Sequence, residues 1–201
     1  MKRDFKEALA HRRSHYGISD KSSISDSEIE NMIEFALVNV PSAFNSQSTR
    51  IVLLIGKEHH KLWSITKETL KAMLPSKAFG KTEEKIDGSF ACGHGTVLFF
   101  EDQSVVKGLE ESFPIYKDNF QPWSWQTSAM HQLAVWTMLE DAGLGASLQH
   151  YNPIIDKAVH EAWNIPENWK LIAEMPFGAP TDKMEDKEIK PLKDRLKVYK
   201  S

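Results

Sequence analysis

The segment from about Ser124 to Ala142 constrains the fold more than any other part of the chain, because its apolar residues lie on several sides of a predicted helix. These residues are Ala129, Met130, Leu133, Ala134, Trp136 and Leu139. A helix of this kind has to be buried, either at the centre of the molecule or against a partner subunit. Gly143 predicts its end, since glycine often follows the last turn of a helix.

Shorter patterns predict further helices and strands around this long helix. Short apolar, β-rich runs predict buried strands at 50–55, 96–100 and 170–177, and residues 146–149 are expected to be extended. Helices are predicted at 4–12, from a capping box at Ser25 to Val40, and at 58–74, 103–112 and 153–163. The proline- and aromatic-rich residues 113–125 predict a covering loop, and the alternating residues 191–199 predict an edge strand. We expect one domain over residues 1–201, with a C-terminal arm over about 181–201.

Composition excludes several classes of protein. The formal net charge is −3 and the sequence has no basic stripe, so no nucleic-acid partner is expected. No apolar run reaches membrane-spanning length and the N-terminus lacks the apolar core of a signal peptide, so we expect a cytoplasmic protein without a membrane partner. The single Cys92 permits no internal disulfide, and the scattered histidines predict no metal site. The motifs of the common serine hydrolases and nucleotide triphosphatases do not occur.

A first polar cluster, Arg12-Arg13-Ser14-His15-Tyr16, has the chemistry of a phosphate site. Arginine offers permanently charged, bidentate donors, and the Ser14 hydroxyl adds another donor. Paired arginines at the end of a short helix are also commonly solvated, so this cluster does not identify a ligand site by itself.

A second cluster follows the helix that Pro41 ends, and it contains Ser42, Ala43, Asn45 and Gln47. Asn and Gln each present a donor and an acceptor, which suits the pyrimidine-like edge of a flavin ring. The same residues are also ordinary loop residues, so this interpretation depends on the rest of the chain.

A third stretch follows the long helix and reads Gly143-Leu144-Gly145-Ala146-Ser147-Leu148-Gln149-His150-Tyr151-Asn152-Pro153. With the three stretches in this order, the chain resembles the nitroreductase family of flavoproteins. It is most similar to the short branch typified by the fatty-acid-repression-mutant and copper-induced nitroreductases.

The resemblance implies an α+β fold, in which helices flank a mostly antiparallel central sheet and two chains form an intertwined homodimer. It implies FMN as the cofactor, bound in the dimer interface. FMN is favoured over FAD because the sequence has no dinucleotide fingerprint. By the same resemblance, Arg12, Arg13, Ser14 and Arg195 bind the phosphate, and Tyr16 also belongs to the cofactor site. Ser42, Ala43, Asn45 and Gln47 meet the ring edge, and Ala146, Ser147 and Leu148 pack beneath the ring.

The implied activity is an FMN-dependent NAD(P)H oxidoreductase that reduces nitroaromatics, quinones or related electron-poor acceptors. Hydride transfer through flavin N5 in a ping-pong sequence requires no catalytic side chain, because the cofactor carries the chemistry. Gln126 or His131 is expected to orient the acceptor, and a role in oxidative stress is implied. The alternative is a flavin-binding regulatory or storage protein without turnover, because fold alone does not settle function. The natural acceptor and the choice between NADH and NADPH stay open.

Overall fold

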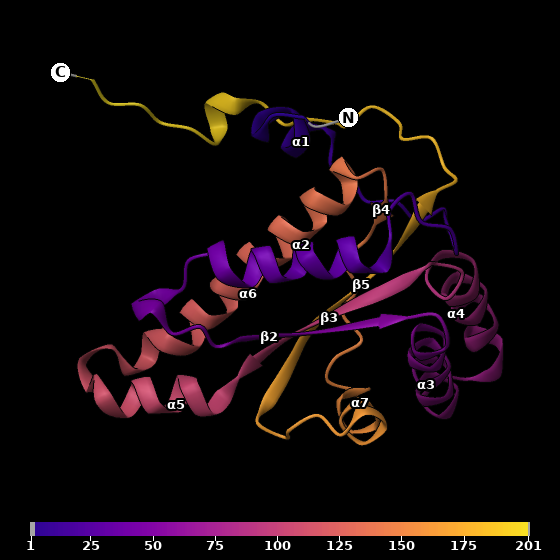
Figure 1. Cartoon of the computed structure of the whole chain (residues 1–201), viewed down its shortest axis with the longest axis horizontal. Helices are drawn as coiled ribbons and strands as arrows, with labels where there is room; N and C mark the ends of the chain where they lie inside the picture. Colours follow the sequence, from indigo (N-terminus) through magenta and orange to yellow (C-terminus); the bar gives the residue numbers. More distant parts are fainter. Residues whose placement is uncertain (1–2, 201) are drawn as a thin grey trace.

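An antiparallel sheet of five strands runs through the molecule in the computed structural model, which describes residues 3–200 (Figure 1). Its long strands are β2 (Thr49–Ile55), β3 (Gly95–Asp102) and β5 (Trp169–Pro180). The order is β1–β5–β3–β2, where β1 is the short strand Ile18–Ser19, and the short strand β4 (Gly145–Ala146) also pairs with β5. The predicted α+β fold with an antiparallel sheet is therefore confirmed.

Helices cover both faces of this sheet. On one face, α2 (Asp26–Asn39) and α6 (Lys117–Asp141) pack against Val97 and Phe99 of β3. On the other face, α3 (Lys57–Met73), α4 (Ser76–Ser89) and α7 (Asp156–Trp163) pack against Leu98 and Phe100. Successive β3 side chains thus point to opposite faces, and both faces are buried, which explains the unbroken apolar run in the sequence. Two further helices are α1 (Phe5–His11) and α5 (Gln103–Ser112).

Local sequence signals account for several of these boundaries. Ser25 caps α2 and forms the predicted capping box with Glu28. Pro75 separates α3 from α4, a helix that the sequence analysis did not assign. Leu74 is extended, because proline disfavours a helical conformation in the preceding residue. None of the helices within residues 3–200 is long and apolar enough to cross a membrane.

The prediction of a covering loop at 113–125 is wrong. Residues Pro114–Tyr116 form a 3₁₀ turn, and α6 begins at Lys117, with Pro122 inside it. Proline in a helix removes one backbone hydrogen bond, and this cost has to be offset by tertiary packing. Phe120 supplies such packing, since it is 2% exposed and its ring lies 5.4 Å from those of both Phe44 and Trp123.

The predicted edge strand at 191–199 is also not formed in the described chain. Leu192–Asp194 make a single 3₁₀ turn, and the neighbouring residues have no regular structure. No strand of the same chain lies beside this segment to supply backbone partners, and its apolar side chains are exposed, with Leu196 at 62% and Tyr199 at 88%. Beyond this turn the chain runs outward from the sheet toward the C-terminus (Figure 1). Residues 1, 2 and 201, at the ends of the predicted domain and arm, lie outside the described residues.

Glu174 is a fully buried carboxyl group in the middle of β5. Its Oε2 accepts the Tyr151 N–H at 2.8 Å, whereas Oε1 has no hydrogen-bond partner within residues 3–200. Burial, together with the nearby Asp156 carboxyl, raises the pKa of Glu174 from 4.5 to about 8. In the folded protein at neutral pH this side chain is therefore protonated, whereas in the unfolded chain it is ionised.

This difference predicts how stability changes with pH. Between about pH 4.5 and 8 only the folded state holds the Glu174 proton, so the free energy of unfolding should fall by about 1.4 kcal/mol per pH unit. The contribution is fully present at lower pH and is lost by about pH 8. In Glu174→Gln this slope should be absent, so the variant should gain stability relative to the wild type as pH rises. Urea unfolding of both proteins across this pH range measures the difference in their free energies of unfolding. An equal difference at every pH would contradict the assignment. Glu84→Gln, at an exposed position, is the control.

Candidate functional site

The fold brings the first and third sequence motifs into direct contact. Residue Ser14 forms a parallel bridge with Ala146 of β4, and the His15 N–H donates to the Ala146 carbonyl at 2.9 Å. Gly145 permits this approach, because a Cβ atom there would lie 2.8 Å from the His15 Cβ. A side chain at this position would force the two segments apart.

The Arg12 side chain has a buried hydrogen-bond donor without an acceptor. Its guanidinium carbon lies 4.3 Å from the centre of the Trp136 ring on α6, which is a cation–π contact. Its Nε atom is buried and has no hydrogen-bond partner within residues 3–200. Because a buried unpaired donor is costly, this arrangement suits a site for an anionic ligand.

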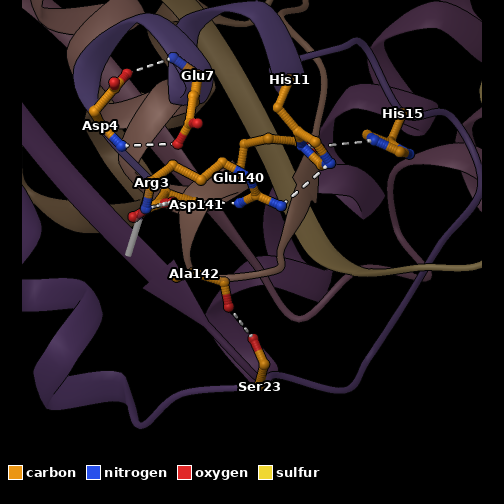
Figure 2. A network of polar contacts seen from close by, with 9 residues as sticks. All are labelled: Arg3, Asp4, Glu7, His11, His15, Ser23, Glu140, Asp141 and Ala142. Atoms are coloured by element: carbon orange, nitrogen blue, oxygen red, sulfur yellow. Dashed lines mark hydrogen bonds and ion pairs between the residues drawn. The ribbon is translucent and has the colours of Figure 1, made fainter. Parts of the chain in front are cut away.

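Arg13 and His15 border a separate cavity of about 400 Å³ that Glu140 also lines. Figure 2 shows the surrounding network, in which Glu140 lies near His11 and His15 and Arg3 pairs with Asp141. His15 Nδ1 also lies 2.7 Å from Asp182, the second residue after β5. Burial alone would raise the pKa of Asp182, but hydrogen bonds from the Gly17 N–H and from His15 lower this pKa. The network therefore joins α1, the end of α6 and the root of the C-terminal arm.

The second motif forms a tight loop with an unusual backbone. Phe44, Asn45 and Gln47 have positive φ angles of 56°, 50° and 49°. For a bulky residue such as Phe44 this conformation is strained, and such residues persist only where their surroundings hold them. Ser42 Oγ accepts the Gln47 N–H at 3.0 Å and so ties the two ends of the loop together.

An aromatic cluster holds one side of this loop. The Phe44 ring lies 4.8 Å from Phe113, 5.4 Å from Phe120 and 6.1 Å from Trp123. Beside it is a cavity of about 300 Å³ lined by Ala43, Phe44, Trp123, Gln126, Thr127 and Met130. The structure thus places the predicted acceptor-orienting residue Gln126 next to the predicted ring-edge residue Ala43.

A buried polar network supports the other side of the loop. Glu101 is fully buried and accepts hydrogen bonds from Ser48 Oγ at 2.5 Å and Thr49 Oγ1 at 2.6 Å, and burial raises its pKa. His131 Nδ1 lies 3.0 Å from the Thr127 carbonyl and 3.3 Å from Thr49 Oγ1. A carbonyl can only accept, so we assign the proton of the neutral ring to Nδ1, which leaves Nε2 as an acceptor. Burial lowers the pKa of His131 and favours this neutral form.

His131 lines a cavity of about 300 Å³ together with Ser42, Gln47, Thr49 and Arg50. His131 and Gln47 were predicted from the sequence, whereas Thr49 and Glu101 were not. A signal was available in the sequence, because Glu101 and Asp102 are charged residues that directly follow the buried apolar run 96–100. Buried charges need partners, so a carboxylate in that position indicates a polar network.

Other predicted site residues differ in their accessibility. Ala146 and Ser147 are 0% and 1% exposed, so among the three residues predicted beneath the ring only Leu148 presents surface in the single chain. Tyr16 is 47% exposed, with its ring 6.4 Å from that of Phe90. Arg195 is exposed on the arm. The cofactor roles of these residues stay predictions.

The predicted flavin site, called the cradle below, has two halves that do not meet in one chain: a phosphate half (Arg12–Ser14 with β4) and a ring-edge half (the Ser42–Gln47 loop). The Ser42–Gln47 loop follows the C-terminal end of α2, whereas Arg12–Ser14 and β4 lie toward the other end of that helix (Figure 1). With 14 residues, α2 is roughly 21 Å long at about 1.5 Å per residue. The cavities that border the two halves share no lining residue. Among residues 3–200, no group of three or more His, Cys, Asp or Glu side chains could hold a metal ion.

Comparison with known proteins identifies relatives of this chain. Residues 9–179 match the sequence model of the Nitroreductase family. The yeast (Saccharomyces cerevisiae) protein HBN1 is 34% identical over 176 residues, which cover 87% of this chain and 86% of HBN1. The nitroreductase FRM2 of the same yeast is 30% identical over 198 residues, which cover 98% of this chain and 97% of FRM2.

Solved structures agree with these sequence relationships. The nitroreductase CinD from Lactococcus lactis, in complex with nicotinic acid, matches with a TM-score of 0.90 and 42% identity over 98% of this chain and 100% of CinD. Its complex with 4-nitrophenol matches with a TM-score of 0.89 and 41% identity over the same shares. The family match over most of the sequence and this agreement in fold lead to one conclusion: the chain belongs to the nitroreductase family and has the nitroreductase fold.

Proposed function

We propose that this nitroreductase-type oxidoreductase binds FMN and uses NAD(P)H to reduce small electron-poor acceptors such as nitroaromatics or quinones. The observation that carries the proposal is the unpaired, buried Arg12 donor near Ser14 and Ala146, where the first and third motifs meet. Bound FMN would supply hydride chemistry in both half-reactions. The protein's own contribution is then to bind, orient and shield the reactants.

The residues present fit a phosphate monoester. Arg12 offers charged donors, and Ser14 is exposed beside it with its hydroxyl available. Arg13 and Arg195 are the further cations that the family resemblance assigns to this group. The ring-edge contacts fall to Asn45 and Gln47, whose loop is held in one conformation by the Phe44 cluster and the Glu101 network.

A homodimer would complete the cradle, because in one chain the cavities that border the phosphate half and the ring-edge half share no lining residue. An apolar groove of about 470 Å³ between α1, α2 and α6 supports this assembly, and Phe5, Leu9, Phe35, Met130 and Leu133 line it. Phe5 is 77% exposed and Phe35 60%, and apolar surface of this kind usually marks an interaction site. A second copy of the chain would bury this groove and supply the missing half of each site.

The cavity beside Phe44 is a suitable place for the acceptor. It is lined by aromatic and apolar side chains with Gln126 and Thr127 as polar groups, which favours flat, largely apolar molecules with polar substituents. The relative CinD has been solved with nicotinic acid and with 4-nitrophenol, which are single-ring compounds of this type. A cavity of about 300 Å³ accommodates one such ring at a time, so we expect ping-pong kinetics, in which the nicotinamide leaves before the acceptor enters.

An absorbance spectrum of the purified protein, before and after anaerobic addition of NADH or NADPH, tests the proposed function. Flavin bands should bleach with one of the two nucleotides and return when 4-nitrophenol or a quinone is added. A protein that binds FMN but stays oxidised with both nucleotides would instead support the regulatory or storage function. A protein that takes up no FMN would contradict the proposal altogether.

A further inference from the structure

Trp136 is a tryptophan whose indole N–H is buried without a partner. It lies on α6 and packs partly against the core formed by α2, α6 and the sheet. Its Nε1 atom has no hydrogen-bond partner within residues 3–200. A buried tryptophan normally pairs this donor, and leaving it unpaired costs about 1–3 kcal/mol.

Two other tryptophans, Trp63 and Trp163, do pair this donor. Trp63 is fully buried, and its Nε1 donates to Thr96 Oγ1 at 3.0 Å. Trp163 donates to Glu58 Oε2 at 2.8 Å. The unpaired donor of Trp136 is therefore not a general property of how this protein packs its indole rings.

The neighbour of Trp136 points to a ligand as the missing partner. The Arg12 guanidinium lies 4.3 Å from the Trp136 ring centre, and Arg12 Nε is the other buried donor at this place that lacks an acceptor. Two adjacent donors, one of them charged, suit an anionic acceptor with several oxygen atoms. A phosphate group meets this requirement, because its oxygens can accept from both side chains at once.

We propose that Trp136 is part of the phosphate-binding site, where its indole N–H donates to the phosphate of FMN while its ring holds the Arg12 guanidinium in position. This inference rests on the proposed function, since FMN supplies the phosphate. It adds a residue that the sequence analysis assigned to the core, and it gives the cradle a donor that is fixed by the packing of α6.

Trp136→Phe separates the two contributions of this side chain, because phenylalanine keeps an aromatic ring beside Arg12 and lacks the N–H. The test compares the affinity for FMN with that for riboflavin, which has the same ring and no phosphate. In the variant, FMN affinity should fall by about tenfold or more, as for the loss of one hydrogen bond to a charged group, while riboflavin affinity stays within about twofold. Trp125→Phe is the matched control, since Trp125 lies on the same helix and is 45% exposed. This substitution should leave the affinities for both flavins unchanged.

Nuclear magnetic resonance of the wild type gives a test that does not depend on the variant folding. The indole N–H resonance of Trp136 should shift strongly when FMN is added and only weakly with riboflavin. Equal shifts with both flavins, or a variant that loses affinity for both flavins equally or for neither, would overturn the inference. A wild type that binds FMN no more tightly than riboflavin would instead contradict the proposed phosphate site as a whole.

Discussion

Arg12→Ala should purify largely without FMN, whereas the wild type should be yellow. Arg12 is the cation whose buried Nε lacks an acceptor and whose guanidinium is already fixed against Trp136, so little side-chain freedom remains to be lost on binding. A hydrogen bond to a charged group contributes about 1.5–3 kcal/mol, so the affinity for FMN should fall by about tenfold to a hundredfold. Flavin content after gel filtration and titration of the apoprotein with FMN measure this loss.

The neighbouring residue provides a matched comparison. Arg13 has the same charge, but its side chain lines the cavity that His15 and Glu140 share. We therefore expect Arg13→Ala to weaken FMN binding less than Arg12→Ala does. Arg12→Lys should restore only part of the affinity, because lysine keeps the charge and loses the planar, bidentate donors. If Arg12→Ala retains full flavin content, the phosphate site has been placed at the wrong residue.

Removal of residues 191–201 should weaken the dimer and cofactor binding together. In the single chain, Leu192, Leu196 and Val198 are 62–64% exposed and Tyr199 is 88% exposed. Exposed apolar side chains that lie this close together usually mark a contact with another protein surface. The same segment carries Arg195, the predicted distant cation of the phosphate site. We expect the truncated protein to shift from dimer to monomer at micromolar concentration and to lose FMN at the same time.

Analytical ultracentrifugation and flavin absorbance on the same samples measure the two effects. Arg195→Ala in the full-length chain separates them, because it removes the cation and keeps the apolar contacts. This variant should stay dimeric while its FMN affinity falls. A truncated protein that remains a fully yellow dimer would show that the arm contributes neither to the interface nor to the cradle.

Elements with strong local signals could be predicted from the sequence. The capping box at Ser25, the apolar periodicity of the second helix and the buried run 96–100 each specify their structure locally, and the structure agrees. The meeting of Ser14 with Ala146 could be expected only from the family resemblance, because no local pattern relates residues so far apart in the chain.

The errors have a common physical cause, which is that contacts between distant residues, whether formed or missing, decide the structure over local preference. Pro122 and the aromatic residues around it predicted a loop, but the packing of Phe120 against Phe44 stabilises a helix there. The alternation at 191–199 predicted a strand, yet a strand forms only where another backbone supplies its hydrogen bonds. Likewise, the roles of Thr49 and Glu101 depend on the side chains that surround them and are not set by the residues beside them in the sequence.

The left-handed loop of Phe44, Asn45 and Gln47 has a consequence for the thermodynamics of binding. Its backbone is fixed by the aromatic cluster and by the Ser42 hydrogen bond as soon as the chain folds. A ligand that meets this loop therefore finds the backbone already ordered, and only the exposed side chains of Asn45 and Gln47 have conformational entropy to lose on association. Selectivity at this edge should then follow from the shape of the ligand, because the backbone of the loop is not free to adapt to it.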